Sequence, residues 1–545
     1  MTIQYRSTAM GLSAMVTTPH YLASQAALTI LKQGGNAVEA MIAAASTIGV
    51  VYPHMNGIGG DNFWLIYNAE KEELKAINSS GRSSENATIE FYMEKGYDKI
   101  PARGPLAANT VPGAIAGWQK AYDYSKKDMQ GQLDFQLLLK EAIHYAKNGF
   151  PVTLSQNYWT KVNLDPADEE FRGLGRYKEF CNIFLNNGQP YEPGEIMKQE
   201  DLANTLEMVA KYGADYFYKS DFTKKLVEDL ERQGGLLTLE DFDFHSADFV
   251  EPLSVDYRNY KAYNLPPNTQ GMASLSILNI LNHMDLSTVQ EGSSTYYHIL
   301  IEAIKNAFRD RDTYLTDPDF VEIPVEELLS KERGALYAER IKKNEEAQVL
   351  AKLDPKGDTV WMGIVDEYGN AVSFIQSIYH EFGSGIIPKG TGVLLQNRGS
   401  FFSLEKNHPN RLDPRKRSFH TLNPAMLLEK GKPKLVYGTM GGEGQPQTQA
   451  LLVTRIIDYE MNVQQAIEAP RFLYGRTWGA DSNSLKVESR IDNQVIEELL
   501  TKGHKVEVLA PFTDVMGHAG AIWIAKNNVK YGGADPRGDG TALGY

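Results

Sequence analysis

The sequence predicts an α+β fold in which helices and strands form separate layers rather than alternating along a parallel sheet. Three observations predict it: helical patterns near the N-terminus, a helix-rich middle third and strand-like runs in the last third. No Pro/Gly/Ser-rich linker, low-complexity block or internal repeat divides the chain. We therefore expect one domain over residues 1–545.

The N-terminal part predicts two helices separated by a glycine pair. The first covers Leu22 to Lys32 and is closed by Gly34-Gly35, and Asn36 caps a second that begins at Ala37. A glycine-containing loop then leads into a strand candidate at Phe63 to Tyr67.

The middle third is helical, for example from Thr295 to Arg309, and the last third changes to strands. Strand-like runs lie at 359–366, 371–378, 391–395, 424–428 and 434–438. The segment 341–358 before them is polar, contains Pro355 and Gly357, and predicts an exposed connection.

Composition excludes several classes of function. The chain has 55 Lys+Arg against 69 Asp+Glu, a formal net charge of −14, which argues against a nucleic-acid partner. Its one cysteine, Cys181, excludes an intramolecular disulfide and a Cys-cluster metal site, and its apolar neighbours predict a buried thiol. His380-Glu381 lacks the second His of a zinc helix, so we expect neither metal nor cofactor.

The most apolar long stretch, Ala37 to Val51, is too short to span a bilayer, and the first residues lack the apolar core of a secretory signal. We therefore expect a soluble, cytoplasmic protein without a membrane partner.

A hairpin at 359–378 brings two hydroxyl groups together. The runs Thr359 to Asp366 and Asn370 to Ile378 flank a three-residue loop with Gly369 in the position that favours a left-handed conformation. If Asp366 faces Asn370, Thr359 faces Ser377, close enough for their side chains to interact. A one-residue change of register would lose this pairing.

A threonine hydroxyl needs an adjacent base to act as a nucleophile. If Thr359 is the N-terminus of a chain, its own α-amine, with a pKa of about 7.7–8.0, can take the proton. This chemistry requires cleavage between Asp358 and Thr359, for which an exposed upstream segment is suited.

A glycine-rich loop, Gly438 to Gly444, lies between an apolar strand and a helix expected from about Pro446. Its backbone N–H groups could converge on a developing oxyanion. Phosphate binding competes as an interpretation, but no Gly-Lys-Ser/Thr ending follows and Glu443 would repel phosphate. A plain turn is the third reading, and the loop alone does not decide among them.

Together these pieces resemble the γ-glutamyltranspeptidase family of N-terminal-nucleophile hydrolases, over nearly the whole chain. The matching segments are GGNAVEAMIAAA (34–45), PHMNGIGG (53–60), LAANTVPGAIAGW (106–118), EAIKNAFRDRDTYLTDPDF (302–320), GDTVWMGIVDEYGNAVS (357–373), FGSGI (382–386), GGEG (441–444) and ADPRGDGTALGY (534–545).

The resemblance implies a four-layer αββα sandwich and a precursor that cuts itself. The products would be a large subunit, 1–358, and a small subunit, 359–545, assembled as one large–small pair or as two pairs. Thr359 would be the nucleophile, with Ser377 where the family has a hydrogen-bonded Thr. Gly441 and Gly442 match the oxyanion-hole glycines. An ester intermediate would form on Thr359 and be resolved by water or an amine.

The residues around the substrate depart from the family's best-known members. Ser80 stands at the apparent position of an Arg, with Arg82 two residues later, and Tyr379 stands at that of an Asn. The remaining substitutions are Arg398 for a Gln or Glu, Phe401 for an Asp, and His420-Thr421 for paired serines. Phe401 cannot hold a substrate ammonium, whereas Arg398 offers a bidentate carboxylate site.

This set is similar to the branch of the family that contains oxamate amidohydrolase and cephalosporin acylases, whose substrates carry a carboxylate near the scissile amide. The short linker from Phe402 to Ser418 predicts an open site, and we therefore favour hydrolysis over transpeptidation. A γ-glutamyltransferase or glutathione hydrolase is the alternative enzyme, and a non-catalytic binding homologue is the alternative class.

Overall fold

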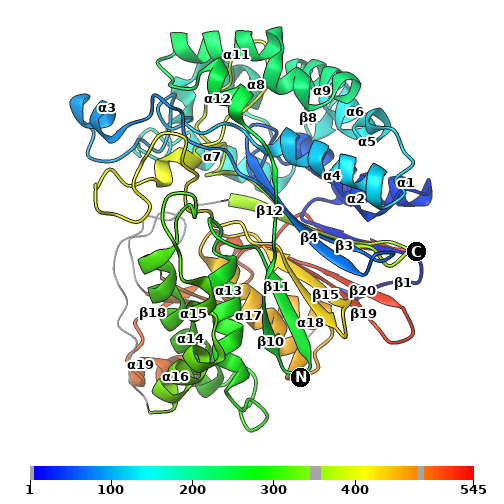
Figure 1. Cartoon of the computed structure of the whole chain (residues 1–545), viewed down its shortest axis with the longest axis vertical. Helices are drawn as coiled ribbons and strands as arrows, with labels where there is room; N and C mark the ends of the chain where they lie inside the picture. Colours follow the sequence, from blue (N-terminus) through cyan, green and yellow to red (C-terminus); the bar gives the residue numbers. More distant parts are fainter. Residues whose placement is uncertain (1–4, 169, 344–357, 476–483) are drawn as a thin grey trace.

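Two seven-stranded antiparallel sheets stack on one another and are covered on their outer sides by helices (Figure 1). The computed structural model describes residues 5–168, 170–343, 358–475 and 484–545. The helices of the first half of the chain cover one sheet, and those of the second half cover the other (Figure 1).

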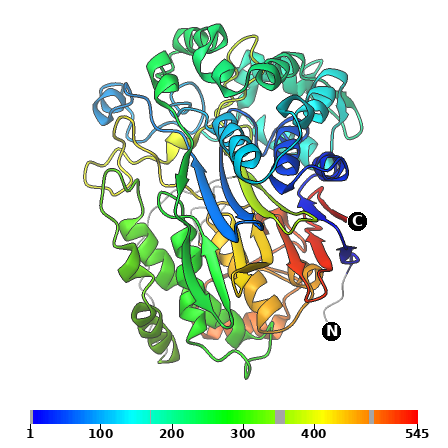
Figure 2. The same ribbon diagram turned by 45° about the vertical axis from the view of Figure 1, so that its right-hand side comes forward.

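The sheet that contains the predicted nucleophile, hereafter the β12 sheet, combines strands from both ends of the chain. Its order is β21 (Thr541–Gly544), β2 (Met15–Thr18), β12 (Asp358–Val365), β13 (Ala371–Tyr379), β3 (Asp61–Asn68), β4 (Glu73–Ser79) and β9 (Asp248–Val250). The C-terminal strand thus pairs with an N-terminal one, which Figure 2 shows as red beside blue.

The second sheet, hereafter the β15 sheet, carries the strand before the glycine-rich loop. Its order is β1 (Ala9–Gly11), β20 (Lys530–Ala534), β19 (Ala519–Ile524), β15 (Lys432–Thr439), β14 (Ala425–Glu429), β11 (Tyr260–Asn264) and β10 (Leu253–Tyr257). Short pairs outside both sheets are β5 (Phe150–Pro151) with β8 (Ile196–Met197), and β6 (Leu185–Asn186) with β7 (Gln189–Pro190); a small third sheet contains β16 (Phe472–Tyr474), β17 (Leu485–Glu488) and β18 (Val506–Leu509).

The helices divide between the two outer sides. On the side of the β12 sheet are α1 (Tyr21–Lys32), α2 (Ala37–Val51), α3 (Ile89–Glu94), α4 (Ala114–Asp128), α5 (Phe135–Leu138), α6 (Lys140–Asn148), α7 (Leu154–Asn163), α8 (Lys178–Phe184), α9 (Glu200–Tyr212), α10 (Ala214–Lys219), α11 (Asp221–Arg232) and α12 (Leu239–Phe244). On the side of the β15 sheet are α13 (Gly271–Asn282), α14 (Ser294–Tyr314), α15 (Val325–Leu328), α16 (Lys331–Lys342), α17 (Gly444–Ile457), α18 (Val463–Glu468) and α19 (Asn493–Thr501).

Alternating side chains along the strands build the layers. In β3, Phe63 and Leu65 enter the apolar core between the sheets, whereas Trp64 and Ile66 enter the core under the helices. This period of two is what a strand buried on both faces requires. A separate core, which includes residues of α13, α14 and α17, covers the outer face of the β15 sheet. The layers are therefore helix, sheet, sheet and helix, and the predicted four-layer αββα sandwich is confirmed.

Most predicted elements are confirmed with small shifts of their ends. Asn36 caps α2 through a capping box: its side chain accepts from the Val38 and Glu39 N–H groups, and the Glu39 carboxylate accepts from the Asn36 N–H. The strands predicted at 359–366, 371–378, 424–428 and 434–438 correspond to β12, β13, β14 and β15.

Three predictions differ from the structure. The strand expected at 391–395 is wrong: Gly390 and Gly392 adopt positive φ angles of 74° and 66°, which turn the chain, and only Leu395 forms a single bridge, to Gly59. Of the connection at 341–358, Ile341 is buried in α16, and 344–357 lie outside the described residues. Cys181 is half-buried rather than buried, and its Sγ donates to the Gly175 carbonyl at 3.2 Å.

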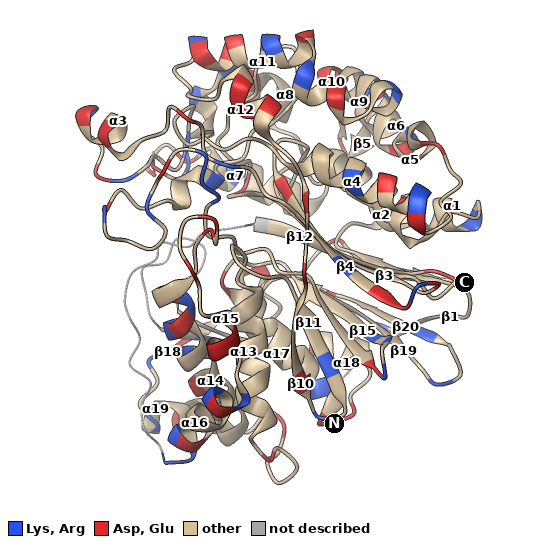
Figure 3. Cartoon of the chain, viewed as in Figure 1, with Lys and Arg blue, Asp and Glu red and all other residues tan. Residues whose placement is uncertain are grey.

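Charged residues concentrate on the outer helices and connecting loops, whereas the strands of both sheets carry few of them (Figure 3). Within the described ranges, no helix combines the length and the apolar character that crossing a bilayer requires.

Candidate active site

The β12–β13 hairpin has the register that the sequence predicts. Its pairs run from Val365 opposite Ala371 to Val360 opposite Gln376. Beyond Val360 the register shifts, because Asp358 pairs with Tyr379. Thr359 therefore lies at a bulge opposite Ser377 and Ile378, and the ladder brings it to Ser377 as expected.

The Thr359 side chain is buried. The residue is 1% exposed, and its Oγ1 makes no hydrogen bond to any residue that the structure describes. Alternation along β12 puts its side chain on the face of Trp361, between the two sheets. Asp358 and Thr359 are consecutive residues of one strand, so this is the uncleaved chain.

Asp61 extends this constellation onto the next strand, since it pairs with Ser377 across β3 and β13. Its fully buried carboxylate collects four donors. Oδ1 accepts from the Gly81 and Gly113 N–H groups at 3.0 and 3.2 Å and from Gln396 Nε2 at 3.0 Å. So many donors stabilise the charged carboxylate in a buried position.

The fourth donor is His420, whose Nε2 lies 3.1 Å from Asp61 Oδ2. The other ring nitrogen, Nδ1, accepts from the Leu422 N–H at 3.4 Å, which assigns the proton to Nε2. Burial lowers the pKa of His420 to about 3, and the nearby positive charge of Arg398 acts in the same direction. His420 is therefore a neutral donor that fixes Asp61 rather than a cation.

Arg398 is a buried cation next to this pair. It begins the 3-10 helix Arg398–Phe401, is 1% exposed, and places its Cζ 4.0 Å from the centre of the Tyr379 ring. Burial lowers its pKa to about 10, so it stays charged at neutral pH. Its Nε and Nη1 have no hydrogen-bond partner among the described residues. A buried cation with two unused donors is suited to accept an anion.

Arg398 adjoins an aromatic cluster through the Tyr379 ring. Phe401 packs edge-on against Tyr379 with ring centres 5.7 Å apart and stacks on Phe419 at 4.9 Å. Tyr379 has a φ of 80°, and its N–H donates to Ser377 Oγ at 2.8 Å. Arg398 is thus linked through Tyr379 to the hydroxyl opposite Thr359.

The glycine-rich loop presents two backbone donors. Gly441 and Gly442 have positive φ angles of 114° and 52°, and α17 begins at Gly444. Within the described part of the chain, neither the Gly441 nor the Gly442 N–H donates a hydrogen bond. Such N–H groups are suited to stabilise an oxyanion.

Gln270, the N-cap residue of α13, connects this loop to His420-Thr421. Its Nε2 donates to the Thr421 carbonyl at 2.7 Å and to the Gly442 carbonyl at 2.8 Å, and its Oε1 accepts from Arg311 Nη1 at 3.1 Å. Arg311 in turn pairs with Glu443 at 3.2 Å. Thr421 itself offers a buried Oγ1 without a partner among the described residues.

Arg82, predicted to bind substrate, is engaged by other parts of the chain. Its Nη1 lies 3.1 Å from Asp317 and its Nη2 lies 2.7 Å from Asp319. Nη1 also donates to the Arg415 carbonyl at 3.2 Å. These contacts link distant segments, and a role of Arg82 in substrate binding stays a prediction.

Sequence reasoning missed Asp61, Gln270 and Arg311. Asp61 carried a signal, since it directly follows the Gly59-Gly60 pair and is the only ionised residue type in its strand Asp61–Asn68. Gln270 carried none, because its partners Arg311, Thr421 and Gly442 lie 41, 151 and 172 residues away along the chain.

Three residues of the candidate site are buried. Thr359, Tyr379 and Arg398 are each 1% exposed. The open site expected from the short linker between Phe402 and Ser418 stays a prediction.

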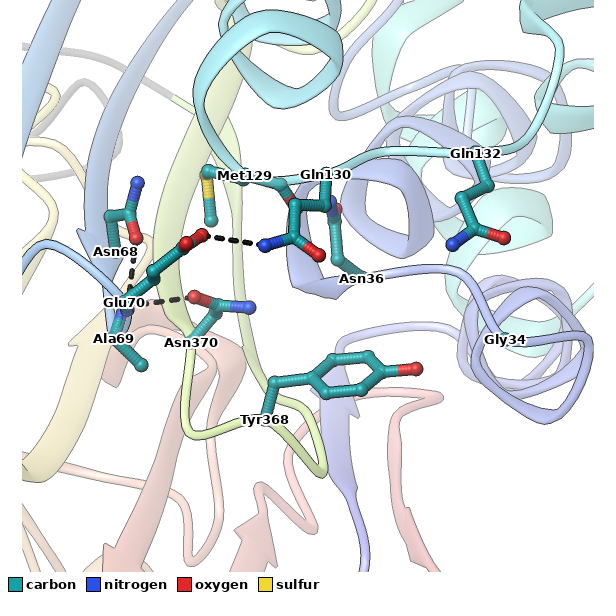
Figure 4. Close-up of a pocket in the computed structure, with 10 residues that line it drawn as sticks. All are labelled: Gly34, Asn36, Asn68, Ala69, Glu70, Met129, Gln130, Gln132, Tyr368 and Asn370. Atoms are coloured by element: carbon teal, nitrogen blue, oxygen red, sulfur yellow. Dashed lines mark hydrogen bonds between the residues drawn. The ribbon is translucent and has the colours of Figure 1, made fainter.

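A cavity of about 410 Å³ lies instead at the turn of the same hairpin, about 20 Å from Thr359 by strand length (Figure 4). Its polar groups satisfy one another: Gln130 Nε2 donates to Glu70 at 2.9 Å, and the Ala69 N–H donates to Asn370 at 2.9 Å. This cavity therefore carries no sign of a ligand.

Comparison with known proteins decides the family. The family model described as Gamma-glutamyltranspeptidase matches residues 23–545. The chain belongs to this family.

Two relatives and one solved structure match nearly the full length. The chain is 46% identical over 536 residues to the glutathione hydrolase-like YwrD proenzyme of Bacillus subtilis, covering 98% of this chain and 99% of the relative. It is 45% identical over 532 residues to the oxamate amidohydrolase proenzyme of Klebsiella pneumoniae, covering 97% and 98%. The crystal structure of cephalosporin acylase from Bacillus halodurans superposes with a TM-score of 0.90 at 34% identity, covering 100% of this chain and 98% of that one.

These matches confirm the predicted family, its N-terminal-nucleophile fold class and the expectation that the chain is an enzyme of this hydrolase family. The residue roles and the subunit boundary stay predictions.

Proposed function

We propose that this γ-glutamyltranspeptidase family member is a self-processing N-terminal-threonine amidohydrolase that hydrolyses small amides bearing a carboxylate near the scissile bond. The observation that carries the proposal is the buried Arg398 guanidinium, two of whose nitrogens lack a partner among the described residues. A substrate carboxylate would supply the missing acceptors in the bidentate geometry that Arg prefers.

Processing would convert the uncleaved chain into the active form. Thr359 Oγ1 attacks the Asp358 carbonyl carbon, the C–N bond breaks, and the nitrogen takes the hydroxyl proton and becomes an α-amine. Water then hydrolyses the resulting ester, which frees the Thr359 hydroxyl and leaves a carboxyl group on Asp358. The products are 1–358 and 359–545, and removal of the upstream segment from the end of β12 would open the site.

Turnover would use the same hydroxyl with the new α-amine as its base. The α-amine takes the Oγ1 proton as Thr359 attacks the substrate carbonyl, and the Gly441 and Gly442 N–H groups stabilise the oxyanion. The leaving amine takes that proton, and water resolves the ester on Thr359. Ser377 lies across the ladder from Thr359 and would position its hydroxyl.

The substrate class follows from charge. Arg398 lies over the Tyr379 ring, which contacts Phe401, and Phe401 stacks on Phe419. A substrate ammonium group placed beside Arg398 would meet a positive charge, and the nearby Asp61 carboxylate is already shared among four donors. The named activities of the oxamate amidohydrolase and cephalosporin acylase relatives agree with a carboxylate-bearing amide.

A second candidate is a glutathione hydrolase or γ-glutamyltransferase, because the YwrD relative is named glutathione hydrolase-like. Phe401 argues against it, since the glutamyl amine would lack its acidic partner. The register that brings Thr359 next to Ser377, together with the backbone N–H groups of Gly441 and Gly442, unused within the described part of the chain, supports an enzyme rather than a non-catalytic homologue.

The test is the intact mass of the purified chain under denaturing conditions. Two fragments, the smaller beginning at Thr359, are expected for the wild type, and one full-length chain is expected for Thr359→Ala. Thr295→Ala, at an exposed position of α14, is the control that should be cut normally. Normal cutting of Thr359→Ala would refute the nucleophile assignment.

Substrate screening then separates the two enzyme candidates. Oxamate and glutaryl amides should be hydrolysed, whereas a γ-glutamyl anilide should not. Release of glutamate from the anilide, competed by glycylglycine, would instead support the γ-glutamyltransferase.

A further inference from the structure

Two histidines and a glutamate converge on the outer helical layer of the β15 sheet, apart from the active-site residues. His298 and Glu302 lie four residues apart on α14, which puts them on one face of that helix. His504 follows α19, and its N–H donates to the Leu499 carbonyl at 3.2 Å. Figure 1 shows α14, α19 and β18 grouped at the lower left, and α19 contacts both other elements.

The distances suit a shared ligand. His298 Nδ1 and His504 Nε2 are 2.9 Å apart, and one ligand atom from each of the three residues lies within 4.8 Å of the others. Two ligands of one tetrahedral Zn²⁺ are about 3.3 Å apart, because Zn–N and Zn–O distances are about 2.0–2.2 Å. The two rings would move apart by about half an ångström, and the carboxylate would move inward by a rotamer adjustment.

The two facing ring nitrogens share one hydrogen bond, so one of them carries the proton. Binding of one ion by both rings requires that this proton move to the other nitrogen of its ring, which leaves a lone pair on each facing nitrogen. Both imidazoles then bind in the neutral form that metal ions accept.

We propose that His298, Glu302 and His504 form a binding site for a divalent transition-metal ion, of which Zn²⁺ is the best match. Two nitrogens and one carboxylate oxygen are a ligand set that Zn²⁺ accepts, with a fourth position for water. Lys305 Nζ lies 2.6 Å from Glu302 Oε1, so the ion must compete with this ammonium group for the carboxylate.

If the chain is cleaved as proposed, a metal ion at this site would link the two subunits. His298 and Glu302 belong to 1–358 and His504 belongs to 359–545, so a bound ion would join the two subunits. Metal binding that links separate segments stabilises the assembled state. The binding itself does not depend on the cleavage.

The experiment is titration of EDTA-treated, full-length protein with ZnCl₂ by calorimetry, and with Co²⁺ by its visible absorption. We expect one saturable site per chain. His298→Ala and His504→Ala should each weaken binding by more than about 100-fold, since even residues that only support metal ligands contribute about 10- to 100-fold. Lys305→Gln should bind several-fold more tightly, because it removes the competing cation.

His408→Ala is the matched control, a half-buried histidine on a distant loop that should leave the titration unchanged. Melting temperatures of the metal-free variants verify that each is folded. If His504→Ala does not fold, His504→Gln takes its place. The same titration on Thr359→Ala separates this inference from the proposed function, because the uncut chain should still bind Zn²⁺. Absence of saturable binding, or binding that neither histidine substitution weakens, would overturn the proposal.

Discussion

Arg398→Ala is the substitution that most directly tests how the substrate is recognised. The guanidinium is 1% exposed, lies 4.0 Å from the Tyr379 ring centre, and has two nitrogens without partners among the described residues. Removing one member of a buried, hydrogen-bonded charge pair costs about 2–5 kcal/mol. At about 1.36 kcal/mol for each factor of ten, kcat/KM for a carboxylate-bearing amide should fall about 30- to 5,000-fold. Because the pairing exists in the ground state as well, most of the loss should appear in KM.

The assay compares each carboxylate-bearing amide with its methyl ester, after intact mass has shown that the variant is processed. Arg398→Ala should penalise only the charged substrate, and Arg398→Lys should recover part of the loss because it keeps the charge but not the paired geometry. Arg82→Ala is the matched control, since its guanidinium is bound to Asp317 and Asp319. Equal losses on acid and ester, or an unchanged KM for the acid, would refute the assignment.

Three further outcomes are expected. Gln270→Ala should lower kcat about 10²- to 10³-fold with a smaller change in KM, because the loop loses the donor that fixes the Gly442 carbonyl and with it the conformation of the residue whose N–H is assigned to the oxyanion. Gln270→Glu should not restore kcat, since a carboxylate repels both carbonyls. Steady-state kinetics check this, and an unchanged kcat would remove Gln270 from the site. The rate of the mature enzyme should rise with pH through a group that titrates somewhat below about 8, because a protonated α-amine cannot accept the Thr359 proton. A flat pH–rate profile from about pH 5 to 9, with chemistry as the rate-limiting step, would contradict the mechanism. Burial lowers the pKa of His20 to about 3, so the unfolded chain gains a proton as pH falls below about 6.5 while the folded chain does not. The free energy of unfolding should therefore drop by about 2 kcal/mol at pH 5 relative to pH 7. His20→Asn can keep the cap on Leu22 and should remove this part of the pH dependence of the urea midpoint.

The features that could be predicted from the sequence are those fixed by neighbouring residues. The hairpin register follows from one short loop, in which Gly369 adopts a φ of 88° and the alternation of buried residues excludes a slip. The start of α2 follows from the Asn36–Glu39 capping box. Local rules therefore place Thr359 opposite Ser377 without knowledge of the rest of the chain.

The features that could not be predicted depend on contacts between distant segments. Arg82 is bound by Asp317 and Asp319, which lie more than 230 residues later in the chain. Asp61 and Gln270 likewise acquire their contacts only when segments far apart in the sequence meet, as with Asp61 and His420 or Gln270 and Gly442. Pairing across such separations leaves no periodic pattern in the sequence.

The unused hydrogen-bond donors of Arg398 connect the proposed substrate preference with the stability of the folded site. Two guanidinium nitrogens without an acceptor among the described residues destabilise the empty site, and neighbouring Asp61 cannot relieve this fully because its carboxylate is already shared among four donors. An acidic residue at the position of Phe401 would neutralise Arg398 within the protein and leave no requirement for an anionic substrate. With Phe401 in that position, a substrate carboxylate would recover the free energy lost in folding the empty site. Under the proposed function, discrimination against an uncharged amide would then follow from the composition of the site and would need no steric exclusion.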